Sequence, residues 1–185
     1  GVKKIFLPSI VNMRPARPEH QHTVLCPYVQ AFPYVSRSAF DYSALGVEVF
    51  TPVFHFNQNE SDMKKEFYLF GKTLGRSRPA VDRALKEAFD AWDEFSRRLT
   101  ARGKELIDSL KPEETALVIV GRSYNTMDSG MNLELPQKLR ELGTIAIPFD
   151  MLPLDSAVDE PLAKDMYWKS GQKILAAAKL IKDDQ

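Results

Sequence analysis

The chain has 185 residues, and its 25 Lys and Arg balance its 25 Asp and Glu to a formal net charge of zero. That balance argues against a basic nucleic-acid surface and against an acidic tail. With 44% hydrophobic and 10% aromatic residues the chain is able to bury a core, which excludes a mainly disordered protein. It holds no apolar run of about 20 residues, and its first residues lack the features of a signal peptide. We therefore expect a soluble, cytoplasmic protein that binds neither membrane nor nucleic acid.

Cys26 is the only cysteine of the sequence. An intramolecular disulfide is therefore excluded, and one thiol by itself builds neither a zinc nor an iron–sulfur site. Either the thiol is inert or its partners lie elsewhere. A strand-like segment over residues 2–7 begins without an initiator Met, which favours a piece excised from a longer polypeptide.

In the first third of the chain, short apolar runs are ended or interrupted by proline. Three of them predict strands: 4–9, 23–26 and 47–56. Pro52 weakens the last of these, because proline donates no ladder hydrogen bond. Cys26 would lie at the carboxyl end of its strand, where ligands gather in open α/β sheets. Between the strands we expect a loop over 11–22 and a short helix over 28–39, interrupted by Pro33.

The middle of the chain has the apolar spacing of two helices. The first is predicted over 62–74, with Asn59 or Ser61 as its N-cap. The second is a long helix over 79–110, in whose first turn Pro79 fits. Its apolar stripe is typical of core or interdomain packing.

The last third repeats strands and helices in alternation. The expected elements are a strand over 116–121, a polar loop over 122–130, a helix over 133–142 stopped by Gly143, a strand over 144–148, and a final helix with Asp159 as its cap and Pro161 in its first turn. This alternation predicts parallel strands with right-handed crossovers. The fold class is α/β: one Rossmann-like three-layer domain over 1–185, with a mainly parallel sheet and one long helix.

The loop between Gly121 and Gly130, with the residues just after it, is the densest polar cluster. Its candidate binding residues are Arg122, Tyr124, Asn125, Asp128 and Asn132. Such a loop after a strand suits an anionic or polar ligand, because backbone N–H groups of the next helix help to hold it. The alternative is a surface loop whose Asn and Asp only turn the chain. The sequence contains neither a P-loop nor a dinucleotide fingerprint.

Cys26 could be a metal ligand, a redox thiol or a core residue, and its local context does not decide among these. His20 and His22 lie in a proline-rich segment, where solvated side chains are the simpler interpretation. No catalytic role is supported for His55.

Several stretches together resemble a known family: 5–10, 26–30, 121–125 through Asn132, Pro136, 138–139, 143–153 and 166–175. They are similar to the C-terminal half of the large CoA-substrate-specific enzyme activases, the activators of (R)-2-hydroxyglutaryl-CoA dehydratase. That half is itself similar to the D-component of the dehydratase.

The resemblance implies a Rossmann-like subdomain in which cysteines from separate segments of one polypeptide hold an iron–sulfur cluster. Cys26 matches the cysteine of the family's Cys-Pro-Tyr motif and would be one thiolate ligand, the others lying before residue 1 and after residue 185. Arg122, Tyr124 and Asn125 match a second motif, in which Ser123 stands where the family more often has proline. ATP would bind only to other domains of the parent protein.

The leading hypothesis is therefore a fragment of an activator of 2-hydroxyacyl-CoA dehydratase that contributes to an iron–sulfur domain in ATP-driven one-electron transfer. The loop from Arg122 to Asn132 would contact the cluster pocket or an anionic substrate group. Partners would be other domains of the polypeptide, with an acyl-CoA dehydratase or an electron donor. The fragment alone is not expected to be active. The alternatives are a non-catalytic interaction domain that docks through its long helix, and a small-ligand-binding domain that uses the loop over 121–132.

Overall fold

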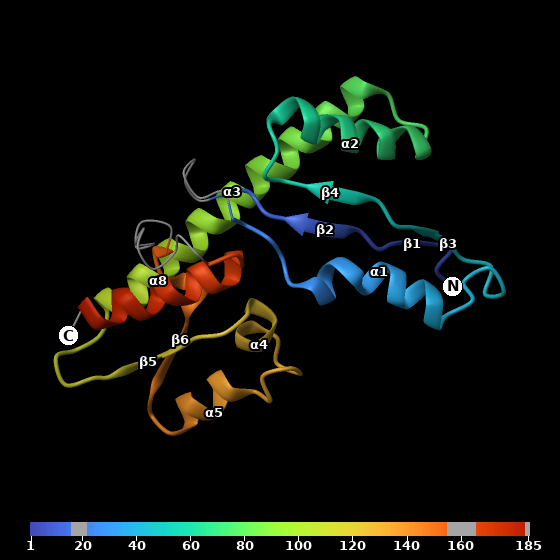
Figure 1. Ribbon diagram of the computed structural model, residues 1–185. Helices are drawn as coiled ribbons and strands as arrows, with labels where there is room; N and C mark the ends of the chain where they lie inside the picture. Colours follow the sequence, from blue (N-terminus) through green and yellow to red (C-terminus); the bar gives the residue numbers. More distant parts are fainter. Residues whose placement is uncertain (16–21, 155–165, 184–185) are drawn as a thin grey trace. The chain divides into compact units, whose positions relative to one another are not determined.

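The computed structural model describes residues 1–15, 22–154 and 166–183 (Figure 1). The backbone divides into two compact units, here called unit 1, with the described residues of 1–87 and 164–169, and unit 2, with those of 88–163 and 170–185. His20 and the expected helix cap, Asp159 with Pro161, lie outside the described residues. The expectation that 1–185 form a single domain stays a prediction.

The fold is α/β, as expected, and its strands pair in parallel. The pairs are β1 (Lys4–Phe6) with β3 (Glu48–Phe50), β2 (Ser9–Asn12) with β4 (Val53–His55), and β5 (Ala116–Ile119) with β6 (Ile145–Pro148). The expected long helix is α3 (Arg78–Asp108). The predicted α/β class with parallel strands and one long helix is thus confirmed.

Two prolines divide what the sequence suggested were single strands. Pro8 separates β1 from β2, and Pro52 separates β3 from β4, because proline has no N–H for the ladder. The register is unchanged across both breaks, since Phe6 pairs with Phe50 and Ser9 with Val53. The ladder continues past the expected end of the first strand, so that Asn12 belongs to β2 and not to a loop.

The strand expected over 23–26 does not form. Only Val24 makes bridges, to Asn12 and to Trp168, and helix α1 (Pro27–Ala39) begins directly after Cys26. Pro27 explains the change, because its fixed φ suits a first helical position and it donates no strand hydrogen bond. The helix continues through Pro33 without the expected interruption.

An aromatic cluster forms the core of unit 1 between β4 and helix α2 (Glu60–Thr73). Phe54 is buried and stacks on Phe67 with ring centroids 4.2 Å apart, and Phe70 meets Phe6 at 5.2 Å. Asn59 caps the helix as predicted, since its side chain accepts the Asp62 N–H at 3.0 Å. Stacked rings therefore hold α2 against the strands.

Unit 2 places a helix where a loop was expected. After β5 the chain forms the short helix α4 (Ser123–Met127), followed by α5 (Leu135–Glu141). Gly143 follows α5 with a positive φ of 78°, the conformation expected of a C-terminal stop. Strand β6 then leads into a 3-10 turn, η1 (Phe149–Met151), and the last described helix is α8 (Lys169–Asp183).

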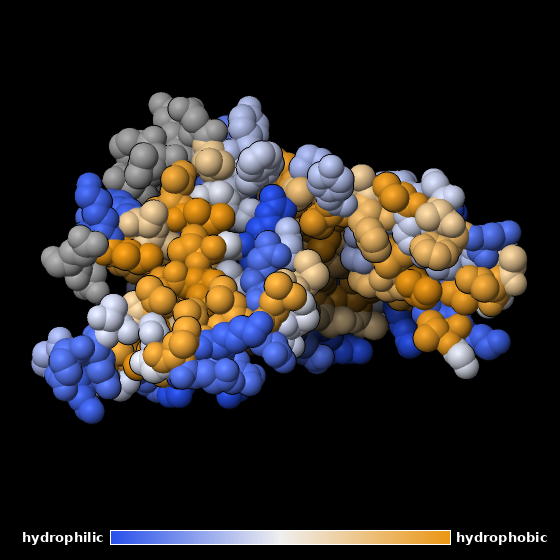
Figure 2. Space-filling view, turned by 90° about the horizontal axis from the view of Figure 1, so that it is seen from below, coloured by the Kyte–Doolittle hydropathy of each residue, from blue (hydrophilic) through white to orange (hydrophobic). Residues whose placement is uncertain are grey.

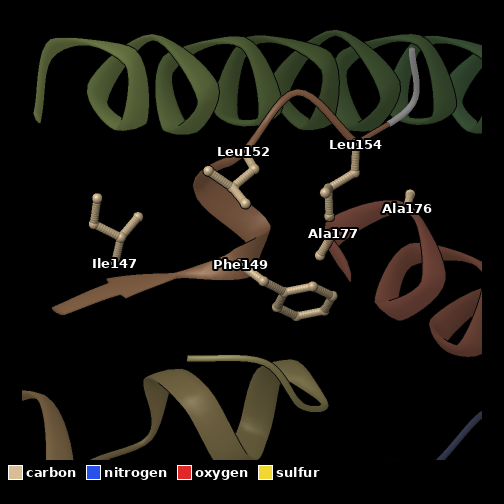
Figure 3. Close-up of a cluster of buried hydrophobic side chains, with 6 residues drawn as sticks. All are labelled: Ile147, Phe149, Leu152, Leu154, Ala176 and Ala177. Carbon is tan, nitrogen blue, oxygen red and sulfur yellow. The ribbon is translucent and has the colours of Figure 1, made fainter. Parts of the chain in front are cut away.

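The core of unit 2 is mainly aliphatic. Figure 3 shows its six buried side chains gathered between β6 and α8: Ile147, Phe149, Leu152, Leu154, Ala176 and Ala177. The alanines of α8 let the helix approach closely, so the larger side chains fill the space between helix and strand. Within the described ranges, no helix is long and apolar enough to cross a bilayer.

Candidate functional site

Cys26 lies at the start of α1, where it occupies the N-cap position. Its carbonyl oxygen accepts the N–H groups of Val29 at 2.9 Å and Gln30 at 3.2 Å. The Gln30 side chain in turn donates to the Leu25 carbonyl at 2.7 Å. The residue is half-buried and not enclosed in an apolar core. These bonds fix the backbone on both sides of the thiol.

The position of Cys26 is electrostatically suited to a negatively charged sulfur. The N–H groups of the first helical turn carry the positive end of the helix dipole, which stabilises a thiolate nearby. The described residues nevertheless contain no group of three or more His, Cys, Asp or Glu that could hold a metal ion. Cys26 therefore fits as one ligand of a metal centre, and this part of the chain does not supply a full ligand set.

Asn12 and His55 end the two neighbouring strands β2 and β4. They are register partners, and a bulge in β2 lies just before them. The arrows of β2 and β4 point the same way in Figure 1, so both residues lie at the carboxyl edge of the pair. Asn12 also bridges to Val24, two residues before Cys26. This edge thus connects His55 with the segment that leads to the thiol.

Glu66 on α2 holds His55 at two points. One carboxylate oxygen accepts the His55 backbone N–H at 2.8 Å, and the other lies 2.8 Å from Nδ1. Both side chains are partly accessible, with 30% of His55 and 23% of Glu66 exposed. Cross-element contacts of this kind fix the orientation of an imidazole ring.

Helix α1 buries Pro33 and Ser36 and turns an apolar face outward. Ser36 is buried, and the Ser9 hydroxyl on β2 donates to the Gln30 carbonyl at 2.8 Å. Tyr28, Phe32 and Val35, spaced four and three residues apart, are exposed on one face. Figure 2 shows hydrophobic side chains gathered over this helix, toward the right of the view. We call these three residues the apolar face of α1; the helix carries only one charge, on Arg37.

In unit 2 the predicted loop residues do not form one cluster. Arg122 is half-buried at the N-cap of α4, and its carbonyl accepts the Asn125 N–H at 2.7 Å. Tyr124 and Asn125 are exposed on the helix. Arg122, Tyr124 and Asn125 are thus placed by α4, whereas the sequence suggested an open loop.

Asp128 and Asn132 hydrogen-bond the backbone after α4. Asp128 Oδ1 accepts the Met131 N–H at 2.9 Å, and Asn132 donates to the Thr126 carbonyl at 3.1 Å. Asn132 also accepts the Glu134 N–H at 3.0 Å, beside two residues with positive φ. These bonds are those of a turn, the role that the alternative interpretation gave them.

Asp150 is the most deeply buried carboxylate described near these residues, with 9% of its side chain exposed. It follows β6 and accepts the Ser123 hydroxyl at 2.7 Å, while the Lys173 ammonium lies at 3.5 Å. Ser123 was the one departure noted from the family motif, and its hydroxyl fastens α4 to the carboxyl end of β6. We call this edge of the β5–β6 sheet closed in the sense that Ser123 and Lys173 occupy both carboxylate oxygens of Asp150.

Sequence reasoning missed both carboxylates of these edges and set His55 aside. Glu66 is 11 residues from His55, and Asp150 is 27 residues from Ser123. No spacing rule connects such pairs. The one available signal was that Asp150 follows a predicted strand and that His55 lies near the end of another, where polar groups gather in parallel sheets.

Residues 1–152 match the family model described as the CoA enzyme activase uncharacterised domain. The match includes Cys26, the His55–Glu66 pair and the segment from Arg122 to Asn132. No curated protein and no solved structure matches the chain.

Proposed function

The chain belongs to the CoA enzyme activase domain family, and on this premise we propose that Cys26 supplies one thiolate ligand to an iron–sulfur cluster completed by other segments of the same polypeptide. The placement of Cys26 at the start of α1 carries the proposal. A half-buried cysteine at the positive end of a helix has the charge stabilisation and the partial shielding that cluster ligands need.

In this proposal the domain serves an activator of a 2-hydroxyacyl-CoA dehydratase. The bound cluster would supply one-electron transfer, driven by ATP hydrolysis in other domains. This chain would hold the backbone of the cysteine in place, because the Gln30 side chain donates to the Leu25 carbonyl and the N–H groups of Val29 and Gln30 donate to the Cys26 carbonyl. We place the protein in the cytoplasm, with an acyl-CoA dehydratase or an electron donor as its partner.

Arg122, Tyr124 and Asn125 would contact the cluster pocket or an anionic group of the substrate. A guanidinium binds carboxylates and phosphates through paired hydrogen bonds, and α4 holds this one at its start. Arg122→Gln should weaken acyl-CoA binding to the full polypeptide, measured by calorimetry. Lys138→Gln removes an exposed charge from the neighbouring helix and should leave binding unchanged. Equal effects of the two variants would point to a diffuse charge effect.

The cluster itself is tested by anaerobic reconstitution of the full natural polypeptide with iron and sulfide. Cys26→Ser should lose most of the bound iron, together with the visible absorption and the EPR signal of the cluster. Ser38→Ala, on the exposed side of the same helix, is the matched control and should bind iron like the wild type. Circular dichroism of each variant checks that the fold persists. If Cys26→Ser holds wild-type iron with the same spectra, the ligand assignment is wrong.

A second candidate function is docking, which the apolar face of α1 favours. A helix whose buried side carries Ser36 and whose exposed side carries aromatic residues suits burial against a further surface. Phe32→Ser in the full polypeptide should increase hydrogen exchange across α1 if that face is covered there. Leu69→Ser on α2 is the control, because Leu69 is exposed on another helix of the same unit. Iron retained by Phe32→Ser with faster exchange would separate docking from cluster binding.

A further inference from the structure

We propose that His55 accepts a proton from a hydroxyl- or thiol-bearing small molecule at the carboxyl edge of β2 and β4, with Asn12 holding the ligand atom and Glu66 orienting the imidazole. The proposal concerns a site separate from the cluster role of Cys26 and does not depend on it. It rests on three observations: the two-point attachment of His55, the partial exposure of its side chain with no described partner at Nε2, and the amide at the adjacent strand end.

The attachment to Glu66 decides which imidazole nitrogen carries the proton. An ionised carboxylate only accepts hydrogen bonds, so Nδ1 at 2.8 Å must be the donor. The second carboxylate oxygen accepts the His55 backbone N–H at 2.8 Å, and Gln58 donates to the first at 3.4 Å. With Nδ1–H committed to Glu66, neutral His55 presents the lone pair of Nε2.

No described residue hydrogen-bonds Nε2 of His55. The side chain is 30% exposed, so an outside molecule can reach it. An imidazole with a carboxylate at one nitrogen and an open position at the other is the arrangement by which histidine accepts protons in enzymes. Nε2 of His55 is therefore placed to accept a proton.

Asn12, the register partner of His55, carries an amide donor at the adjacent strand end. Its Oδ1 is occupied by the Asn57 N–H at 2.8 Å, which leaves the Nδ2 amide hydrogens directed elsewhere. No described residue accepts from Nδ2. Asn12 and His55 are register partners at the last residues of parallel strands, directly after a bulge. Bulges often re-aim side chains beside functional sites.

The proton-transfer step is balanced without a further reactant. The proton of the ligand's O–H or S–H group moves to Nε2, the imidazole becomes an imidazolium, and the ligand oxygen or sulfur becomes an anion. Glu66 faces the new positive charge through Nδ1, while an Asn12 N–H donates to the new anion. Glu66 is thus a positioning residue, and His55 is the residue that touches the ligand.

The first test reads the tautomer of His55 by nitrogen-15 NMR of the 185-residue chain. The protein has three histidines, so His55→Gln and His22→Gln assign the signals. Neutral His55 should carry its proton on Nδ1 in the wild type, and Glu66→Gln should convert it into a mixture of tautomers. A wild-type His55 protonated on Nε2 overturns the proposal. Because the wild-type spectrum decides, an unfolded variant would not prevent the test.

The second test adds three small probes and follows the Nε2 signal. Ethylene glycol offers a hydroxyl, 2-mercaptoethanol adds a thiol, and 1,2-dimethoxyethane offers neither. One or both of the first two should shift Nε2 in a saturable way, and the difference between them identifies the ligand group. Asn12→Leu should abolish the shift, while Gln137→Leu, at an exposed amide in unit 2, should preserve it. No shift with either protic probe, or an equal shift with the ether, overturns the proposal.

The cluster-ligand role of Cys26 and the proton-acceptor role of His55 are tested independently. Cys26→Ser should leave both the tautomer and the probe response of His55 unchanged, and His55→Gln should leave the reconstituted iron content unchanged. A loss of probe response in Cys26→Ser would mean that the thiol, and not His55, meets the probes.

Discussion

The carboxyl edges of the β2–β4 and β5–β6 sheets carry polar side chains that are satisfied in different ways. In unit 2, Asp150 is nearly buried and is held by Ser123 and Lys173. Among the described residues of unit 1, Glu66 holds His55 at one nitrogen only, and the side chain of Asn12 is bonded through its oxygen only. Parallel strands place polar groups at the same edge in both units. Unit 2 uses them to fasten its own helices, whereas unit 1 leaves a donor and an acceptor available.

The cores of the two units also differ in how they meet the sheet edges. In unit 2 the aliphatic cluster reaches the strand end, where Phe149 is 1% exposed next to Asp150. In unit 1 the aromatic cluster lies between β4 and α2, and the apolar face of α1 points outward. A closed edge is expected to tolerate few changes, and an open edge to tolerate many without loss of fold.

The most damaging way to break the closed edge is Phe149→Ala. It removes a fully buried ring from the unit 2 core and should lower the free energy of unfolding by about 3–5 kcal/mol. Urea denaturation measures the change. Leu142→Ala is the control, because Leu142 is 80% exposed and its loss should have little effect. Similar effects of both variants would mean that Phe149 does not organise the core.

A second comparison concerns two helical glycines, Gly103 in unit 2 and Gly71 in unit 1, at which a neighbouring atom approaches closely. Gly103→Ala should destabilise the chain by about 1–3 kcal/mol, although alanine normally stabilises a helix, because its Cβ would collide with the backbone carbonyl of Met151. Gly71→Ala in unit 1 would instead collide with a side chain, that of Val81, and meet no backbone atom among its nearest neighbours.

Second-site changes separate these two collisions in urea denaturation. Val81→Ala should restore much of the stability lost by Gly71→Ala. Met151→Ala should not rescue Gly103→Ala, since the backbone carbonyl remains. Rescue in the second pair would contradict the predicted backbone collision.

Ser123→Ala and His55→Gln compare how much each sheet edge contributes to the free energy of unfolding. Ser123→Ala deprives Asp150 of a hydrogen bond and should cost about 1 kcal/mol of unfolding free energy. His55→Gln keeps a donor near Glu66 at a half-exposed position and should change stability by less than about 0.5 kcal/mol. Thermal and urea unfolding measure both. A larger loss for His55→Gln would make the His55–Glu66 pair a structural clasp.

The smallest expected effect is a pH dependence in unit 1. The hydrogen bond from Tyr68 to Asp82, at 2.6 Å, raises the pKa of the Tyr68 hydroxyl, with burial and the Asp82 charge acting in the same direction. Since the folded pKa lies above the unfolded value of about 10, the stabilisation is complete below that pH. It is lost as pH rises through the folded pKa.

Urea midpoints measured across the alkaline range test this pH dependence. Tyr68→Phe should flatten the alkaline decline, and Tyr124→Phe in unit 2 should leave it unchanged. An unchanged decline in Tyr68→Phe would assign the pH dependence to other groups.

Local chemistry was enough to predict several elements. The polar side chain of Asn59 marked the start of α2, and Gly143 marked the end of α5, because each satisfies a backbone requirement within a few residues. The apolar runs predicted β5 and β6, and the parallel pairing followed from their alternation with helices. The single cysteine of the sequence and its match to a Cys-Pro-Tyr motif also directed attention to Cys26.

Two predictions of local structure failed, the strand over 23–26 and the open loop over 122–130. The segment before Pro27 looked like a strand, but apart from its bridges at Val24 it found no ladder, so the helix start prevailed at Cys26. The loop after β5 looked open, yet Ser123 reaches Asp150 and the chain winds into α4. Pro27 decided the first case locally, whereas in the second a contact made across the fold accompanies the helix.

The sequence by itself determined the α/β class, the parallel strands, the long helix and the family, because hydrophobic periodicity and motifs are properties of neighbouring residues. Only the tertiary structure decided that His55 faces Glu66, that Asp150 closes one sheet edge and that α1 turns its apolar face outward. Such contacts depend on how strands and helices pack against one another, and the number of residues between two side chains does not predict whether they meet.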